Sequence, residues 1–187
     1  MEIMELIRKR RTIRKFKQEP IDRPILEGLV EAARLAPSGS NLQPVKYKIV
    51  DEPQLVHQVF QHVKWAGYIA PAGNPSENEQ PVAYIAILAD TAIKKSDYEL
   101  DIGAAAQNIF LTALDLGIGT CWMGAIDREK IKEILHIPEQ YILNTVIALG
   151  YPDEEPVMEE EQGSIKYYKD QSGTLHVPKR KLQDIII

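Results

Sequence analysis

The segment from Ser96 to Leu116 is the feature that most restricts how this chain can fold. Ser96 and Glu99 have the spacing of a capping box, which predicts that a helix over residues 97–116 begins here. Alanine, isoleucine, phenylalanine and leucine side chains occupy much of its circumference. Because a helix exposed to water carries a polar face, we expect this one in the centre of a domain or against a second subunit.

Segments with strand patterns would supply the sheet on which this helix packs. VKYKIV at residues 45–50 alternates apolar and charged residues, whereas VAYIAILA at 82–89 is continuously apolar, as in a strand covered on both faces. ILNTVIALG at 142–150 is a third strand, and GTCWMGA at 119–125 is a short strand or turn. Further helices are expected at the N-terminus, after Asp22, around residues 55–63 and after Asp127. This mixed order predicts an α+β layer architecture.

Composition narrows the functional classes. The 187 residues carry a formal net charge of −5 and are 44% hydrophobic, which fits one domain over residues 1–187 and disfavours a nucleic-acid binder. Cys121 is the only cysteine, so no internal disulfide is possible. No apolar run is long enough to cross a bilayer, and the charged N-terminus lacks the pattern of a signal peptide. We expect a cytoplasmic protein without membrane or nucleic-acid partners.

Several common motifs are missing from the sequence. There is no phosphate-binding P-loop, and residues 117–124 fail the dinucleotide fingerprint because Trp122 replaces its third glycine. The four histidines include no pair four residues apart, so no metal site is predicted, and each histidine is interpreted as a surface or hydrogen-bonded residue. Ser38 lies outside a nucleophile-elbow motif.

Basic residues gather near both ends of the chain. Six of the eight residues from Arg8 to Lys15 are basic, and residues 179–181 form a second cluster after a predicted strand. The first cluster either binds an anion or compensates a helix dipole. If the fold brought both clusters together, they could hold a phosphomonoester through charge-assisted hydrogen bonds worth roughly 1.5–3 kcal/mol each.

Five segments, taken in order, make the chain resemble the nitroreductase family over nearly its whole length. They are RRTIRKF, LAPSGSNLQP, DIGAAAQNIFLTALDLGIGTCWMG, ALGYP and HVPKRKL. The resemblance implies a nitroreductase-like three-layer sandwich, in which helices flank a central, mostly antiparallel sheet. It also implies a homodimer with an exchanged C-terminal arm.

The resemblance further implies that FMN is the cofactor and assigns residues to it. Contacts with the phosphate, ribityl chain and ring are implied for Arg10, Arg11, Thr12 and Arg14. The loop that covers the flavin bound mainly by the other subunit is matched by Pro37, Ser38, Gly39, Asn41 and Gln43. Backbone contacts with flavin N5 and O4 are implied for Met123 and Gly124. The resemblance matches Lys179 and Arg180 to the terminal phosphate ligands, and Lys181 could replace either.

The activity expected from this resemblance is that of an FMN-dependent oxidoreductase. NADH or NADPH would reduce the flavin by hydride transfer to N5, and an electron-poor nitroaromatic or quinone would then accept electrons in a ping-pong cycle. The flavin does this chemistry, so no catalytic side chain is predicted. Lys64 and Trp65 are candidate substrate-pocket residues, although Trp65 is equally suited to packing. The alternatives are a relative that fragments flavin or removes halide, and a non-enzymatic flavin-binding module.

Overall fold

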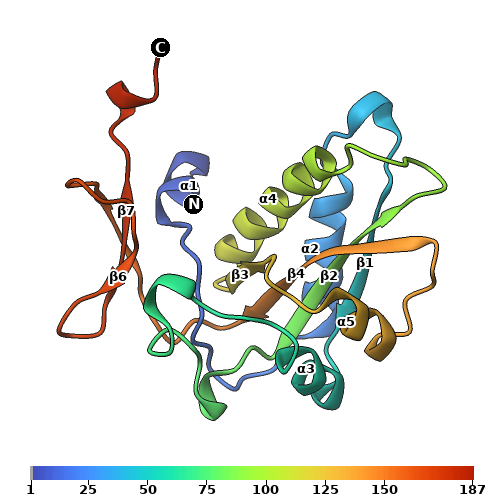
Figure 1. Cartoon of the computed structure of the whole chain (residues 1–187), viewed down its shortest axis with the longest axis horizontal. Helices are drawn as coiled ribbons and strands as arrows, with labels where there is room; N and C mark the ends of the chain where they lie inside the picture. The colour runs from blue at the N-terminus through green and yellow to red at the C-terminus, as the bar shows by residue number, and fades with distance from the viewer. Residues whose placement is uncertain (1) are drawn as a thin grey trace.

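A four-stranded antiparallel sheet forms the middle layer of the computed structural model, which describes residues 2–187 (Figure 1). Its strand order is β1-β2-β4-β3 and every neighbouring pair is antiparallel, which confirms the predicted central sheet. The segment with the less certain pattern, GTCWMGA, contains strand β3. The strands are β1 (Val45–Val50), β2 (Ala83–Asp90), β3 (Gly119–Met123) and β4 (Tyr141–Gly150).

Helices cover both faces of the sheet and complete the three-layer sandwich. On one face, α2 (Arg23–Arg34) and α4 (Glu99–Asp115) pack with Ile85 and Ile87 of β2. On the other, α3 (Pro53–Phe60) and α5 (Arg128–Ile134) pack with Tyr84 and Ala86 of the same strand. All eight residues of β2 are buried, as its continuous apolar sequence predicts. No helix within residues 2–187 has the length and apolar character needed to cross a bilayer.

The ends of two helices test the predicted caps. The Asp127 side chain accepts a hydrogen bond from the Lys130 N–H, so the predicted cap of α5 is confirmed. The capping box at Ser96 is wrong, because α4 begins only at Glu99 and the Ser96 hydroxyl donates to Asp97. Asp97 adopts a φ of 60°, which is incompatible with a right-handed helix and moves the helix start past the box.

The N-terminal segment, residues 10–16, follows α1 (Ile3–Lys9) and runs along the edge of the sheet beside β3. The Ile13 N–H donates to the Thr120 carbonyl at 2.9 Å, and the buried Ile13 and Phe16 side chains cross two glycines. A Cβ on Gly119 would lie 2.9 Å from Ile13, and one on Gly150 would lie 2.8 Å from Phe16. These glycines therefore allow the close approach that fixes the residues between Arg10 and Phe16 against the sheet.

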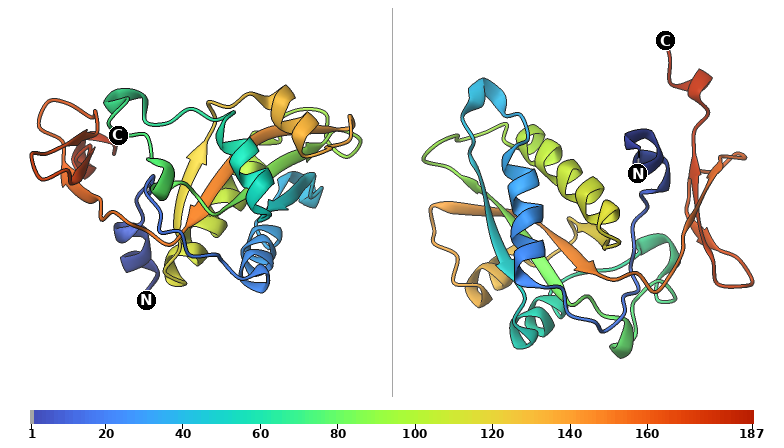
Figure 2. Two further views of the ribbon diagram at one scale, coloured as in Figure 1. Left: turned by 90° about the horizontal axis from the view of Figure 1, so that it is seen from below. Right: turned by 180° about the vertical axis from the view of Figure 1, so that it is seen from behind.

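The C-terminal arm, residues 153–187, forms a second small sheet beside α1 (Figures 1 and 2). Its predicted strands around the DQSG turn are confirmed as an antiparallel pair. A strand within the acidic run, parallel to the last strand, was not expected from the sequence. The sheet order is β5-β7-β6, with β5 (Val157–Glu160), β6 (Tyr168–Lys169) and β7 (Leu175–Lys179). Short 3-10 turns lie at Gly39–Asn41, Gly67–Ile69, Glu77–Glu79 and Leu182–Asp184.

Candidate functional site

Cations from opposite ends of the chain meet where β7 passes the N-terminal segment. Partial burial of its ammonium group is the largest cause that lowers the pKa of Lys179, and the positive charges of Arg11 and Arg10 lower it further. Burial also lowers the pKa of Arg11, and the charge of Arg10 adds to this shift. Such mutual repulsion requires the three charges to lie close together. The fold therefore places the basic segments from the two ends of the chain side by side.

Within residues 2–187 the Arg10–Arg11–Lys179 cluster has no counter-charge of its own. None of its three side chains forms an ion pair with a carboxylate within residues 2–187. The Arg11 guanidinium donates to the carbonyls of Arg8 and Arg10, while its Nε is buried and has no partner in the described part of the chain. Because buried polar groups are nearly always hydrogen-bonded, the free Nε and the uncompensated charge fit an anionic ligand.

Arg10 is held over an aromatic ring of α4. Its guanidinium carbon lies 5.9 Å from the centre of the Phe110 ring, which itself packs on Trp122 of β3. A cavity of about 110 Å³ adjoins this contact and is lined by residues of the N-terminal segment, α4 and β3. Burial lowers the pKa of Arg10 without changing its charge at neutral pH. The arginine is thus oriented by apolar surroundings, and its charge remains available.

Arg14, four residues after Arg10, contacts the C-terminal arm. Its guanidinium lies 4.9 Å from the centre of the Tyr167 ring, and its backbone N–H donates to Glu154 at 2.6 Å. Tyr167 in turn packs on Tyr68, with 4.9 Å between the ring centres. Burial raises the pKa of Cys121 to about 11, although the nearby charge of Arg14 acts in the opposite direction. Arg14 thus lies between the sheet and the arm.

The end of β3 presents open backbone next to Lys64. Gly124 is exposed, and a Cβ added to it would meet nothing within 4 Å. The Met123 carbonyl accepts a hydrogen bond from the Thr145 hydroxyl at 2.6 Å, which fixes the strand end. The Lys64 N–H donates to the carbonyl of Ala125 at 2.9 Å. A flat ligand could therefore approach the Met123–Gly124 backbone closely, with Lys64 beside it.

Trp65 follows Lys64 but points into the protein. Its side chain is 9% exposed and packs against Phe60 with 5.8 Å between ring centres. Its indole Nε1 is buried and has no hydrogen-bond partner among residues 2–187. This position favours the packing alternative for Trp65, and its role in substrate binding stays a prediction.

The loop from Pro37 to Gln43 lies far from the cation cluster of the same chain (Figure 1). It contacts the first turn of α4, where the Gly39 N–H donates to Asp101 at 2.9 Å. Arg10 contacts the same helix at Phe110, nine residues further along, and its cavity extends to Leu114. At 1.5 Å of rise per residue, Asp101 and Leu114 lie about 20 Å apart along the axis. One chain therefore does not bring this loop to the cations.

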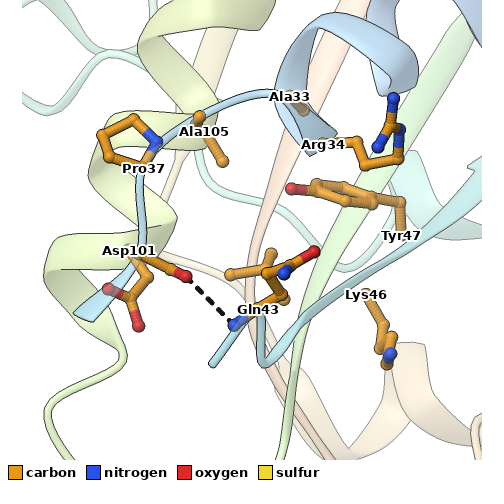
Figure 3. Close-up of a pocket in the computed structure, with 11 residues that line it drawn as sticks. Ala33, Arg34, Pro37, Gln43, Lys46, Tyr47, Asp101 and Ala105 are labelled. Atoms are coloured by element: carbon orange, nitrogen blue, oxygen red, sulfur yellow. Dashed lines mark hydrogen bonds between the residues drawn. The ribbon is translucent and has the colours of Figure 1, made fainter. Parts of the chain in front are cut away.

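A cavity of about 250 Å³ lies under this loop, between α2, β1 and α4 (Figure 3). The loop is closed by a hydrogen bond from the Gln43 N–H to the Ser38 hydroxyl at 3.0 Å, drawn as a dashed line in Figure 3. Gln43 also donates through its side-chain amide to the carbonyl of Asn41. Tyr47 borders the cavity, and burial raises its pKa to about 12. The loop is thus a folded turn with its own hydrogen bonds.

Three further residues predicted to bind FMN, namely Thr12, Arg180 and Lys181, lie near the cation cluster. Thr12 pairs with Thr120 in a parallel bridge beside the cation cluster. Arg180 and Lys181 are exposed and follow β7, next to Lys179 of the cation cluster. Whether Arg180 or Lys181 binds phosphate stays a prediction.

Sequence reasoning missed Asp101, Glu154 and Tyr167, which hold the loop and the N-terminal segment in place. Asp101 offered a signal, because a carboxylate in the apolar stripe of a helix needs a partner when the helix is buried. Glu154 and Tyr167 offered none, since each acts only after the arm has folded back toward Arg14.

Comparison with known proteins decides the family. The model of the nitroreductase family matches residues 7–151, which include the sheet and all five α-helices except the first residues of α1. This chain belongs to the nitroreductase family. The family named from five sequence segments is thereby confirmed.

Relatives agree along most of the chain. A protein from Archaeoglobus fulgidus with the provisional name NADH dehydrogenase/NAD(P)H nitroreductase is 32% identical over 161 residues, covering 82% of this chain and 87% of the relative. The crystal structure of a nitroreductase family protein from Clostridium novyi has a TM-score of 0.69 at 31% identity, covering 81% and 87% of the two chains. An FMN-dependent nitroreductase from Clostridium difficile has a TM-score of 0.67 at 28% identity, covering 82% and 89%.

Proposed function

We propose that this protein is a homodimeric oxidoreductase that binds FMN and uses NADH or NADPH to reduce an electron-poor organic acceptor. The observation that carries the proposal is the Arg10–Arg11–Lys179 cluster, in which three cations converge without a carboxylate partner within residues 2–187. The names of the Archaeoglobus and Clostridium difficile relatives support the nicotinamide and the flavin, respectively.

The residues of this chain fit the parts of FMN. The cation cluster matches the doubly charged phosphate, and Thr12 beside it would donate a hydroxyl. Arg14 would place a positive charge near the pyrimidine edge of the ring, and the open backbone at Met123 and Gly124 would supply N–H groups to N5 and O4. When bound, FMN would supply the redox chemistry, accepting a hydride from NAD(P)H and passing electrons to a nitroaromatic or quinone in a ping-pong cycle.

A second copy of the chain would complete the site. The Pro37–Gln43 loop and the cation cluster lie at opposite ends of α4, so a loop over the flavin has to come from another subunit. Apolar side chains are also exposed beside the cations, where Ile3, Ile7 and Trp122 are 59%, 44% and 46% exposed. An exposed apolar patch of this kind is typical of a subunit interface. We expect the C-terminal arm to reach across the same interface.

Anaerobic mixing of the purified holoprotein with NADH or NADPH tests this function. We expect a flavin absorption spectrum that bleaches on mixing and recovers when a quinone is added. A flavin that stays oxidised would contradict the oxidoreductase function and favour a binding module. Mass spectrometry of the flavin after aerobic turnover adds a second criterion, because a fragmented flavin would favour the alternative in which FMN is the substrate.

A further inference from the structure

An ion pair between the partly buried Lys94 and the buried Asp101 anchors the Pro37–Gln43 loop to α4. Asp101 is 5% exposed and accepts two hydrogen bonds, one from the Gly39 N–H at 2.9 Å and one from Lys94 Nζ at 2.8 Å. Lys94 Nζ also donates to the carbonyl of Asp97 at 2.8 Å. Burial opposes ionisation of Asp101, but the hydrogen bonds from Lys94 and Gly39 outweigh it, so the Asp101 pKa is lowered. The charged pair is therefore the state that holds the loop.

The loop backbone depends on this anchor. Ser40, Asn41 and Gln43 have φ angles of 50°, 54° and 53°, a region that residues with a Cβ rarely adopt. A Cβ at Gly39 would lie 3.2 Å from Lys94 Nζ, so the backbone approaches the ion pair as closely as glycine allows. Such conformations persist only where the surroundings fix them. Here the surroundings are the Ser38–Gln43 hydrogen bond and the Lys94–Asp101 pair.

A buried ion pair is weak support for stability alone. Replacing both partners by apolar residues of similar size is often neutral or stabilising, because neither charge then has to leave water. The pair at Lys94 and Asp101 directs a hydrogen bond at one loop amide, which an apolar pair could not do. This geometry suits a role in fixing loop position.

We propose that Lys94 and Asp101 are positioning residues that hold the Pro37–Gln43 loop over the flavin of the partner subunit. The inference rests on the proposed FMN site. It assigns a function in trans, because the ion pair of one chain would determine how tightly the cation cluster of the other chain retains FMN. Neither residue would touch the flavin.

Two variants separate the loop hydrogen bond from the charge. In Lys94→Met/Asp101→Leu both charges are removed together, so no buried charge is left unpaired, but the acceptor for the Gly39 N–H is lost. We expect FMN to bind about tenfold more weakly, as for one lost hydrogen bond in a preorganised site. Asp101→Asn keeps a side-chain oxygen for the Gly39 N–H, so we expect a smaller loss. The core variant Val59→Ala, in the opposite helix layer, controls for a general loss of stability.

Mixed dimers test whether the ion pair acts across the interface. One chain carries Arg10→Ala and the other Lys94→Met/Asp101→Leu, each with a different affinity tag so that the heterodimer can be isolated. In a shared site, the intact Arg10 of one chain meets the intact loop of the other. We therefore expect one FMN with wild-type affinity per mixed dimer, measured by quenching of flavin fluorescence.

The outcomes distinguish this inference from the function on which it rests. If the wild-type dimer retains FMN but the mixed dimer has no tight FMN site, the positioning role is overturned and the proposed function is not. Wild-type affinity in the Lys94→Met/Asp101→Leu homodimer would also overturn it. A wild-type protein that retains no FMN would overturn the proposed function and the inference with it.

Discussion

The sheet body and the C-terminal arm differ in what holds them together. Every residue of β2 is buried between two helix layers, whereas the arm ends in Leu182, Ile185 and Ile186, which are 69%, 60% and 67% exposed. At the centre of the arm His176 bonds to Glu159 at 2.9 Å and to Asp170 at 3.2 Å. Apolar burial thus stabilises the body, whereas polar contacts such as those of His176 stabilise the arm. If the protein forms the proposed dimer, we expect this arm to be ordered by the partner subunit or by bound FMN.

Truncation of one isoleucine in each region gives the largest expected contrast. Ile87→Ala in the fully buried β2 should lower the free energy of unfolding by about 2–5 kcal/mol, because it leaves a cavity in a packed core. Ile185→Ala, at a side chain 60% exposed in the single chain, should change it by less than about 0.5 kcal/mol if that side chain stays exposed in the dimer. Denaturant unfolding measures both. A large loss for Ile185→Ala would show that the arm is packed in the assembled protein as firmly as the body.

A substitution where the N-terminal segment crosses the sheet, just before the arm begins, should have a smaller effect on stability. A Cβ on Gly150 would lie 2.8 Å from the fully buried Phe16 side chain, so Gly150→Ala must displace the N-terminal segment from the sheet. We expect a loss of about 1–3 kcal/mol in unfolding free energy, typical of overpacking. Gly28→Ala, on the exposed side of α2 with nothing within 4 Å, is the matched control and should be neutral or stabilising. Equal losses of unfolding free energy in the two variants would contradict the close approach of Phe16 to Gly150.

Raising the pH should weaken the arm and leave the body unchanged. Hydrogen bonds from Glu159 and Asp170 raise the pKa of His176. Its contribution is therefore complete below the unfolded-state pKa of about 6.5 and is lost as pH rises through the higher folded-state value. The Tyr168 ring stacks on the imidazole, and no other charged group is bonded to it in the described chain.

Hydrogen exchange, corrected for the intrinsic pH dependence, checks the behaviour of His176. Protection of β7 should fall between neutral and alkaline pH while protection of β2 stays constant. In His176→Gln the change in β7 should disappear. A variant that keeps the wild-type pH profile would show that another group titrates in the arm.

The body was predictable because its sequence patterns are local. The buried strand at 82–89, the alternating strand at 45–50 and the Asp127 cap follow from periodicity and capping. The start of α4 was mispredicted, because the positive φ of Asp97 overrides the capping box and is not encoded by a glycine. In the arm, β5 went unnoticed because its acidic sequence pairs only after β7 is in place.

The candidate site was only partly accessible from the sequence. The basic clusters were visible as charge, but their meeting depends on β7 passing the N-terminal segment, which is a long-range property of the fold. The Lys94–Asp101 anchor joins residues seven apart through a loop with non-helical backbone, so no helical spacing reveals it.

The affinities for FMN and for riboflavin, which lacks the phosphate, test the central claim most directly. In the wild-type protein we expect a clear preference for FMN. Arg10→Ala and Lys179→Ala should each weaken FMN binding by about 10- to 150-fold, the equivalent of 1.5–3 kcal/mol for a charge-assisted contact, and should leave riboflavin binding almost unchanged. Arg23→Ala, an exposed arginine of α2 paired with Glu27 and Asp51, is the control and should change neither. Unchanged FMN affinity in both variants, or equal losses for the two ligands, would contradict the claim that cations from the two ends of the chain bind one phosphate.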